Sequence, residues 1–192
     1  MLIAVDIDDV LADFVNAIAE FHNAAYKTSL RRNQFKTSYY EDTWGGTRDD
    51  AVRKVYEFHT TPLSHNIKPV RGAIDAITEL KKKHKLIVVT SRPNDFEVKT
   101  RKWLEEYFSN KFSQVFFTNH FTLKKMPTKK KVDICKELNV DVMIDDSFDF
   151  MYECHTQNVR GLLFHTPWNK NRVLPASIKR VKSWEEVVKT LI

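Results

Sequence analysis

The sequence has few cysteines and no long apolar run. Among its 192 residues, Cys135 and Cys154 are the only cysteines, and they form no CxxC pair. We therefore expect a reducing compartment, with Cys135 as a small buried apolar side chain on its helix. No apolar run approaches the about 20 residues that a membrane-spanning helix requires, so no membrane association is expected. The start of the chain also lacks the basic segment of a signal peptide, which favours a cytoplasmic protein.

An excess of basic residues indicates an anionic partner. The chain has 31 lysines and arginines against 25 acidic residues, a net charge of +6. Such a balance suits a nucleotide or a nucleic acid and does not choose between them. The run KKMPTKKK at 124–131 concentrates lysines beside a candidate phosphate site. Most of them should form a solvated face, while one in a first helical turn can point at the ligand.

The most informative segment is LIAVDIDDVLADF, where an apolar run near the N-terminus ends in carboxylates. The run predicts a buried parallel strand at 2–6, and open α/β sheets bind ligands at the carboxyl ends of their strands. Asp6 and Asp8 would then be partly desolvated and would need a cation, a catalytic task or strong hydrogen-bond donors. A simpler alternative is that Asp8 or Asp9 only caps a helix that begins near Val10.

Two further apolar runs end in polar residues. The run VMIDDS ends in Asp145 and Asp146, and the run KLIVVTSRP ends in Thr90 and Ser91. Between them, TKKKVDICKEL predicts a helix with Thr128 as its N-cap and lysines in its first turn. Carboxylates at the ends of two distant strands favour a shared site over a local cap.

Apolar runs separated by segments of helical periodicity predict an α/β fold, a Rossmann-like parallel sheet with helices on both faces. The predicted strands are 2–6, 85–90, 114–118, 142–145 and 161–165. The predicted helices are 71–84, 96–108, 128–138 and a C-terminal helix that Ser183 and Glu186 open as a capping box.

The first two strands are separated by far more residues than one crossover helix needs, which predicts an insertion. We expect a small helical cap at 14–69, inserted after the first strand into a core made of 1–13 and 70–192. Pro62 and Pro69 mark the return of the chain to that core.

The expected cap is rich in aromatic and basic residues. Gly45 and Gly46 should break its helices, and most of its aromatic side chains should build its own small core. Tyr40, Trp44 and Arg48 lie near the glycine pair and are the candidates for contact with a substrate.

The sequence resembles the haloacid dehalogenase (HAD) superfamily of phosphohydrolases in the order of four elements. These are the strand-end aspartates, the strand-end threonine, the lysine-rich helix and the second aspartate pair. Within it, the DIDDVLADF opening, the KxxIC spacing from Lys131 to Cys135 and the IDDS ending are most similar to the 5'(3')-deoxyribonucleotidase-type nucleotidases. The resemblance covers essentially the whole chain. It implies a phosphatase that hydrolyses phosphate monoesters through an aspartyl-phosphate, above all a 5'-nucleotidase for (deoxy)nucleoside monophosphates. A nucleic-acid 3'-end phosphatase and a non-catalytic ligand-binding member of the fold stay open as alternatives.

The resemblance assigns the chemistry to the aspartates. Asp6 would be the nucleophile, and Asp8 the general acid and base. Mg²⁺ would be the cofactor, held by the side chains of Asp6 and Asp145 and by the backbone carbonyl of Asp8. Asp146 would bind the metal directly or act through a water molecule.

By the same resemblance, Thr90, Ser91 and Lys131 would bind the phosphate. Lys129 and Lys130 compete with Lys131 for this role, and the KxxIC spacing favours Lys131.

One residue departs from the family pattern, because Asp9 stands where many members carry glycine, which puts a flexible loop there in doubt.

For Arg92, contact with the substrate and a surface salt bridge are equally plausible uses. The expected partner is a small phosphorylated substrate, above all a nucleotide. Stable binding of nucleic acid is not expected, and homodimer formation is left open.

Overall fold

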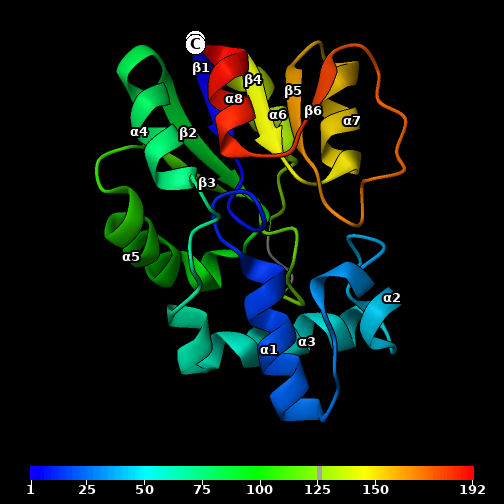
Figure 1. Ribbon diagram of the computed structural model, residues 1–192. Helices are drawn as coiled ribbons and strands as arrows, with labels where there is room; N and C mark the ends of the chain where they lie inside the picture. Colours follow the sequence, from blue (N-terminus) through cyan, green and yellow to red (C-terminus); the bar gives the residue numbers. More distant parts are fainter. Residues whose placement is uncertain (125–126) are drawn as a thin grey trace.

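The computed structural model describes residues 1–124 and 127–192, so two positions of the lysine run at 124–131 lie outside the described residues. The described residues form one six-stranded parallel sheet in the order β3-β2-β1-β4-β5-β6 (Figure 1). Its strands are β1 (Leu2–Val5), β2 (Lys85–Thr90), β3 (Val115–Phe117), β4 (Val142–Asp145), β5 (Arg160–Phe164) and β6 (Ile178–Val181). In the described part of the chain, no helix has the length and apolar character needed to cross a bilayer.

The predicted strands are confirmed to within one residue at each end, and β6 was not predicted. In β6 only Ile178 and Val181 are buried, while Lys179 is exposed and Arg180 is half-buried. This short strand lies at the edge of the sheet, where charged side chains are tolerated. Its sequence IKRV therefore shows neither a long apolar run nor strict alternation.

Helices cover both faces of the sheet, as expected. The helices α4 (Ala73–Lys83), α5 (Glu97–Phe108) and α8 (Trp184–Leu191) pack on one face, and α6 (Lys131–Glu137) and α7 (Phe148–Thr156) pack on the other. Side chains of a strand alternate between the two cores, so Val5 and Val88 join the first and Ala4 and Val89 the second. Cys135 is fully buried in the second core, as predicted.

The segment between β1 and α4 forms helices beyond the carboxyl ends of the strands (Figure 1). They are α1 (Phe14–Tyr26), the 3₁₀ helix η1 (Arg32–Gln34), α2 (Glu41–Trp44), α3 (Arg48–Thr60) and the 3₁₀ helix η2 (Pro62–His65). The chain enters and leaves this segment side by side, because Asp13 N–H donates to Lys68 O and Val70 N–H to Leu11 O, each at 2.8 Å. Gly45 ends α2 at φ +72°, as expected of a helix-breaking glycine.

Two predicted helix starts were wrong. No helix begins at Val10, because residues 7–12 form a tight turn in which Leu11 and Ala12 N–H both donate to Ile7 O. α6 begins at Lys131 and not after Thr128, because Lys129 N–H donates to Thr118 O and holds the preceding segment against the loop after β3. These tertiary contacts outweigh the local preference for helix.

The predicted C-terminal helix α8 is confirmed with one difference at its start. Ser183 Oγ accepts a hydrogen bond from Glu186 N–H, as a capping box requires. The Glu186 carboxylate, however, accepts from Lys182 N–H at 2.8 Å. The cap therefore satisfies two backbone donors, one of them a residue earlier than predicted.

Candidate active site

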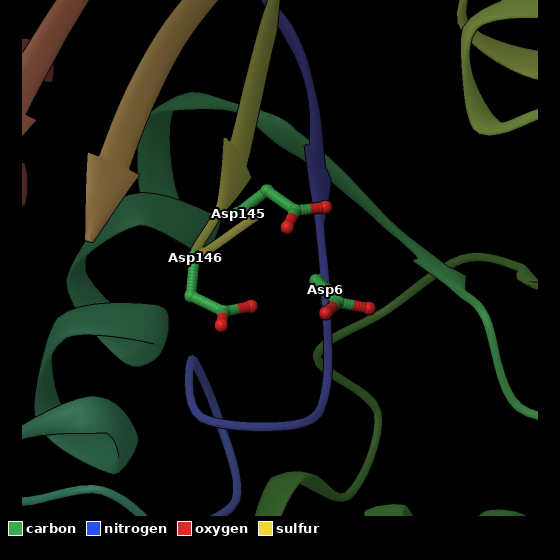
Figure 2. Close-up of side chains that lie close together, drawn as sticks. All are labelled: Asp6, Asp145 and Asp146. Atoms are coloured by element: carbon green, nitrogen blue, oxygen red, sulfur yellow. The ribbon is translucent and has the colours of Figure 1, made fainter. Parts of the chain in front are cut away.

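Three carboxylates meet where the order of the strands reverses. Asp6 follows β1 and Asp145 ends β4, and these neighbouring strands flank the topological switch point of the sheet, where open α/β folds bind ligands. Figure 2 shows the side chains of Asp6, Asp145 and Asp146 pointing into the same space. Each offers an oxygen, and these oxygens all lie within 4.8 Å of one another. The two aspartate-bearing strand ends of the sequence therefore form one cluster.

Lys131 bridges two of these carboxylates. Its Nζ lies 2.9 Å from Asp6 Oδ1 and 2.8 Å from Asp145 Oδ2, and the residue is only 1% exposed. As the first residue of α6, Lys131 points to the carboxyl ends of the strands. Lys129 and Lys130 are exposed and pair with glutamates instead. Of the three competing lysines, Lys131 is thus the one that reaches the aspartates.

The cluster carries more negative charge than Lys131 neutralises. Burial raises the pKa of Asp6 to about 7, with Lys131 opposing this shift and Asp145 and Asp8 adding to it. Burial, followed by Asp145, raises the pKa of Asp146 well above its usual range. Burial alone would lower the pKa of Lys131, but the charges of Asp145 and Asp6 more than offset it and that pKa is raised.

The donor set fits a hard divalent cation. Carboxylate oxygens are the ligands that Mg²⁺ prefers, at about 2.0–2.1 Å, so two oxygens on opposite sides of one ion lie about 4.2 Å apart. The oxygens of Asp6, Asp145 and Asp146 are already gathered within 4.8 Å. A cation among them would offset the burial and, after it, the mutual repulsion that raise the pKa of Asp6 and Asp146.

The Asp8 side chain turns toward the end of β2, where it pairs with Arg92. Arg92 Nε donates to Asp8 Oδ2 at 3.0 Å and Nη2 donates to Asp8 Oδ1 at 2.6 Å, while Nη1 donates to Thr100 Oγ1 at 3.1 Å. Of the two uses left open for Arg92, the salt bridge is present, but it is buried and not at the surface, since Arg92 is only 7% exposed. The ion pair lies beneath the inserted helices and fixes the direction of the Asp8 carboxylate.

The two hydroxyl residues after β2 differ in their surroundings. Thr90 is fully buried, and its Oγ1 accepts a hydrogen bond from Arg92 N–H at 3.2 Å. Ser91 lines the cavity described below, and its buried hydroxyl has no partner among the described residues. Ser91 is therefore the one of the pair whose hydroxyl is left for a ligand.

Asp9 adopts a left-handed backbone conformation with φ +59°. Glycine enters this region without strain, and Asp is one of the few other residues that tolerate it. The side chain is held on two sides, since Asp9 Oδ1 accepts from Val15 N–H at 3.2 Å and pairs with Arg32. Burial raises the pKa of Asp9 to about 6, opposed by Arg32. These two contacts hold the Asp9 side chain in place within the loop.

Arg32 and Trp168 are site residues that the sequence did not indicate. The Arg32 guanidinium lies 4.9 Å from the centre of the Trp168 ring, and Trp168 Nε1 donates to Asp146 Oδ2 at 2.7 Å. Together with the ion pair between Arg32 and Asp9, these contacts connect the inserted helices to the carboxylate cluster. No local sequence pattern marks either residue, because they meet across more than half of the chain.

A cavity of about 310 Å³ opens between the inserted helices and the carboxyl ends of the strands. Asp6, Asp8 and Lys131 lie at its base, and Tyr40 and Arg48 are among the residues that line it from the insertion. Arg48 Nη2 also donates to His120 O at 2.9 Å and so joins the insertion to the loop after β3.

Trp44 does not lie where the sequence suggested. Its ring stacks on Tyr40, with ring centres 4.7 Å apart and an interplanar angle of 11°, and on His22 at 5.0 Å. Tyr40 is one of the cavity-lining residues, whereas Trp44 is not and instead packs against the Tyr40 ring. The neighbouring glycine pair indicated that Trp44 lies near the end of a helix, but it did not indicate the direction of the Trp44 side chain.

Comparison with known proteins agrees with this geometry. The sequence model of the family described as 5' nucleotidase, deoxy (pyrimidine), cytosolic type C protein (NT5C) matches residues 1–192. A nucleotidase of Clostridium acetobutylicum is 26% identical over 185 residues, which are 96% of this chain and 90% of that protein.

Solved structures of hydrolases share the fold. A haloacid dehalogenase-like hydrolase of Streptococcus pneumoniae superposes with a TM-score of 0.70 at 12% identity, covering 100% of this chain and 98% of that one. The HAD hydrolase YfnB of Bacillus subtilis, whose crystal structure is described as bound to magnesium, gives a TM-score of 0.65 at 16% identity, covering 99% and 97%. At these identities the likeness shows the fold alone.

Proposed function

The chain belongs to the NT5C family of 5' nucleotidases, and on this premise we propose that it removes the 5'-phosphate of (deoxy)nucleoside monophosphates with the help of Mg²⁺. It is a phosphoric monoester hydrolase of the HAD type, and its substrate is a small phosphorylated molecule. The observation that carries the proposal is the position of Lys131 between Asp6 and Asp145, at the base of the cavity.

In this proposal Asp6 is the nucleophile. A carboxylate oxygen of Asp6 forms a bond to phosphorus while the bond from phosphorus to the ester oxygen breaks, which leaves an aspartyl-phosphate. Asp8 gives its proton to the departing alcohol. Asp8 then takes a proton from water, which attacks the aspartyl-phosphate and releases inorganic phosphate. The first step needs Asp6 as an anion, which its ion pair with Lys131 supports, and Asp8 as an acid. The second step needs Asp8 as an anion, which its ion pair with Arg92 supports.

Asp6, Asp145 and Asp146, with the backbone carbonyl of Asp8, are the groups that would hold Mg²⁺. When bound, the ion supplies positive charge that offsets the repulsion between the phosphate and the carboxylates. Lys131 adds a fixed positive charge, and the free hydroxyl of Ser91 donates to a phosphate oxygen. Thr90 contributes by holding the backbone of the loop after β2 through Arg92 N–H.

We assign substrate choice to a cap formed by residues 14–69, and phosphate chemistry to a core formed by 1–13 and 70–192. The core offers contacts that every phosphate ester can use, so discrimination requires contacts with the rest of the substrate. Tyr40 and Arg48 line the cavity from the cap and support this division. A cavity of about 310 Å³ falls in the size range of small-molecule sites and supports a small substrate such as a mononucleotide.

A turnover screen tests the proposed function. The panel contains nucleoside and deoxynucleoside 5'-monophosphates, sugar phosphates and a 3'-phosphorylated oligonucleotide, each with Mg²⁺ and with excess EDTA. We expect the highest kcat/KM on a nucleoside monophosphate, loss of turnover with EDTA and recovery when Mg²⁺ is returned. A preference for sugar phosphates or for the oligonucleotide would contradict the nucleotidase assignment, and full activity in EDTA would contradict the role of Mg²⁺.

A further inference from the structure

His59 is a buried residue of the cavity wall that the proposed reaction does not use. It lies in the last turn of α3 and is 4% exposed. Its backbone carbonyl accepts hydrogen bonds from Lys99 Nζ and Ser64 Oγ, but neither ring nitrogen is hydrogen-bonded to another of the described residues. Neither nitrogen is among the enclosed polar atoms that lack a partner, so the ring is accessible from the cavity that His59 lines and can bind a group there.

The His59 ring is held on the side of the cavity where Asp8 lies. It stacks on Phe96 with ring centres 3.9 Å apart, and it lies 6.1 Å from the ring of Phe14. The Arg92 guanidinium, which holds Asp8, lies 5.8 Å from that same Phe14 ring. Since Asp8 is the proposed proton donor to the departing alcohol, we expect this wall to face the alcohol portion of the ester.

The surroundings of His59 favour the neutral imidazole. Burial, and after it the nearby charges of Arg92, Lys99 and His65, lowers the pKa of His59 to about 2. A neutral imidazole has one N–H donor and one nitrogen acceptor. It therefore suits an uncharged polar group, such as a sugar hydroxyl or the edge of a nucleobase, and gives no attraction to a second anionic group.

We infer that His59 is a specificity-determining residue that hydrogen-bonds an uncharged polar group on the alcohol portion of the substrate. The inference rests on the proposed function, because the place of the alcohol follows from the role of Asp8. Its stacking on Phe96 holds the ring in one plane, so the hydrogen bond has a fixed direction. Such a contact discriminates against esters whose alcohol lacks a hydrogen-bonding group.

Two variants separate the hydrogen bond from packing. His59→Phe keeps an aromatic ring against Phe96 and removes both nitrogens, whereas His59→Gln keeps a donor and an acceptor. Their kcat/KM is measured on a deoxynucleoside 5'-monophosphate, on 2-deoxyribose 5-phosphate and on phenyl phosphate. The exposed His65 is outside the cavity lining, and His65→Phe is the matched control.

We expect His59→Phe to lower kcat/KM on the nucleotide by roughly 10- to 100-fold and on phenyl phosphate by less than about twofold. His59→Gln should recover part of the loss, and His65→Phe should match the unsubstituted enzyme. A loss shared by deoxyribose 5-phosphate assigns the contact to the sugar, and a loss confined to the nucleotide assigns it to the base.

Parallel losses on all three esters, or no loss on any, would overturn the inference while leaving the proposed function in place. If the unsubstituted enzyme prefers another hydroxyl-bearing ester, the nucleotide assignment fails. The role of His59 is then decided by comparing the loss in His59→Phe on that ester with its loss on phenyl phosphate. Turnover of no ester at all would overturn the proposed function and the role of His59 with it.

Discussion

Arg92 holds Asp8 with two hydrogen bonds, from Nε to Oδ2 at 3.0 Å and from Nη2 to Oδ1 at 2.6 Å. The guanidinium is 7% exposed and the carboxylate 27%, so the pair lies partly out of water beside the carboxylate cluster. Two-point pairing fixes both the position and the plane of a carboxylate, which a single contact does not do. Arg92 is therefore a positioning residue for the proposed general acid.

Replacing Arg92 should impair esters whose alcohol needs a proton. We expect Arg92→Ala to lower kcat/KM by roughly 10- to 100-fold on a nucleoside monophosphate and much less on p-nitrophenyl phosphate, whose leaving group departs unprotonated. Arg92→Lys should lie between, because lysine cannot pair at two points. Asp8→Asn should show the same contrast, and the exposed Arg101→Ala is the control. Equal losses on both esters would remove Arg92 and Asp8 from proton donation.

Lys131 should be central to stability as well as to phosphate binding. Its replacement by Met leaves Asp6 and Asp145 buried without a cation, and breaking such a pair costs about 3–5 kcal/mol. Urea unfolding in EDTA measures this loss. Lys130→Met removes an exposed ion pair and should cost at most about 1 kcal/mol. Similar small losses in the two variants would contradict the buried bridge.

Mg²⁺ should stabilise the folded protein, because it relieves repulsion within the cluster of Asp6, Asp145 and Asp146. At a concentration a hundredfold above its Kd, the ion should add about 2.7 kcal/mol and raise the Tm visibly. The shift should be reduced in Asp145→Asn and in Asp146→Asn, and NaCl of equal ionic strength should not reproduce it. No shift with saturating Mg²⁺, and none with Mn²⁺, would count against the site.

Tyr40 and Trp44 should differ in their effects, because Tyr40 lines the cavity and Trp44 lies behind it. Tyr40→Ala should lower kcat/KM on nucleoside monophosphates by roughly 1–3 kcal/mol of lost stacking and change hydrolysis of a small aryl phosphate little. Trp44→Ala should act mainly on folding, with a loss of about 2 kcal/mol in the free energy of unfolding. Parallel losses on both substrates in Tyr40→Ala would make that ring structural.

The parts of the site that could be predicted are those fixed by a strand end or a helix start. Asp6 and Asp145 follow short apolar runs, and a parallel sheet brings the carboxyl ends of its strands together. Lys131 could be chosen among neighbouring lysines only through the family spacing. The sheet itself followed from the alternation of apolar runs and helical periodicity, because both depend on local sequence.

The parts that could not be predicted depend on contacts between the inserted helices and the core. Arg92 could not be assigned to Asp8, nor Arg32 to Asp9 and Trp168, because these partners are distant in the sequence and no local pattern links them. The direction of a side chain was equally hidden. Trp44 packs against the Tyr40 ring and does not line the cavity, and His59, which has no distinctive sequence context, does line it.

Asp6 is the residue that we propose attacks phosphorus, and phosphate release by the Asp6→Asn variant measures this role. The amide has nearly the same shape as the carboxylate but cannot act as a nucleophile. At saturating nucleoside monophosphate and Mg²⁺, we expect release to fall by roughly a thousandfold or more. The variant should keep the circular dichroism spectrum of the folded protein, and the exposed Asp133→Asn should keep full activity. Substantial turnover by a well-folded Asp6→Asn enzyme would remove Asp6 from the role of nucleophile.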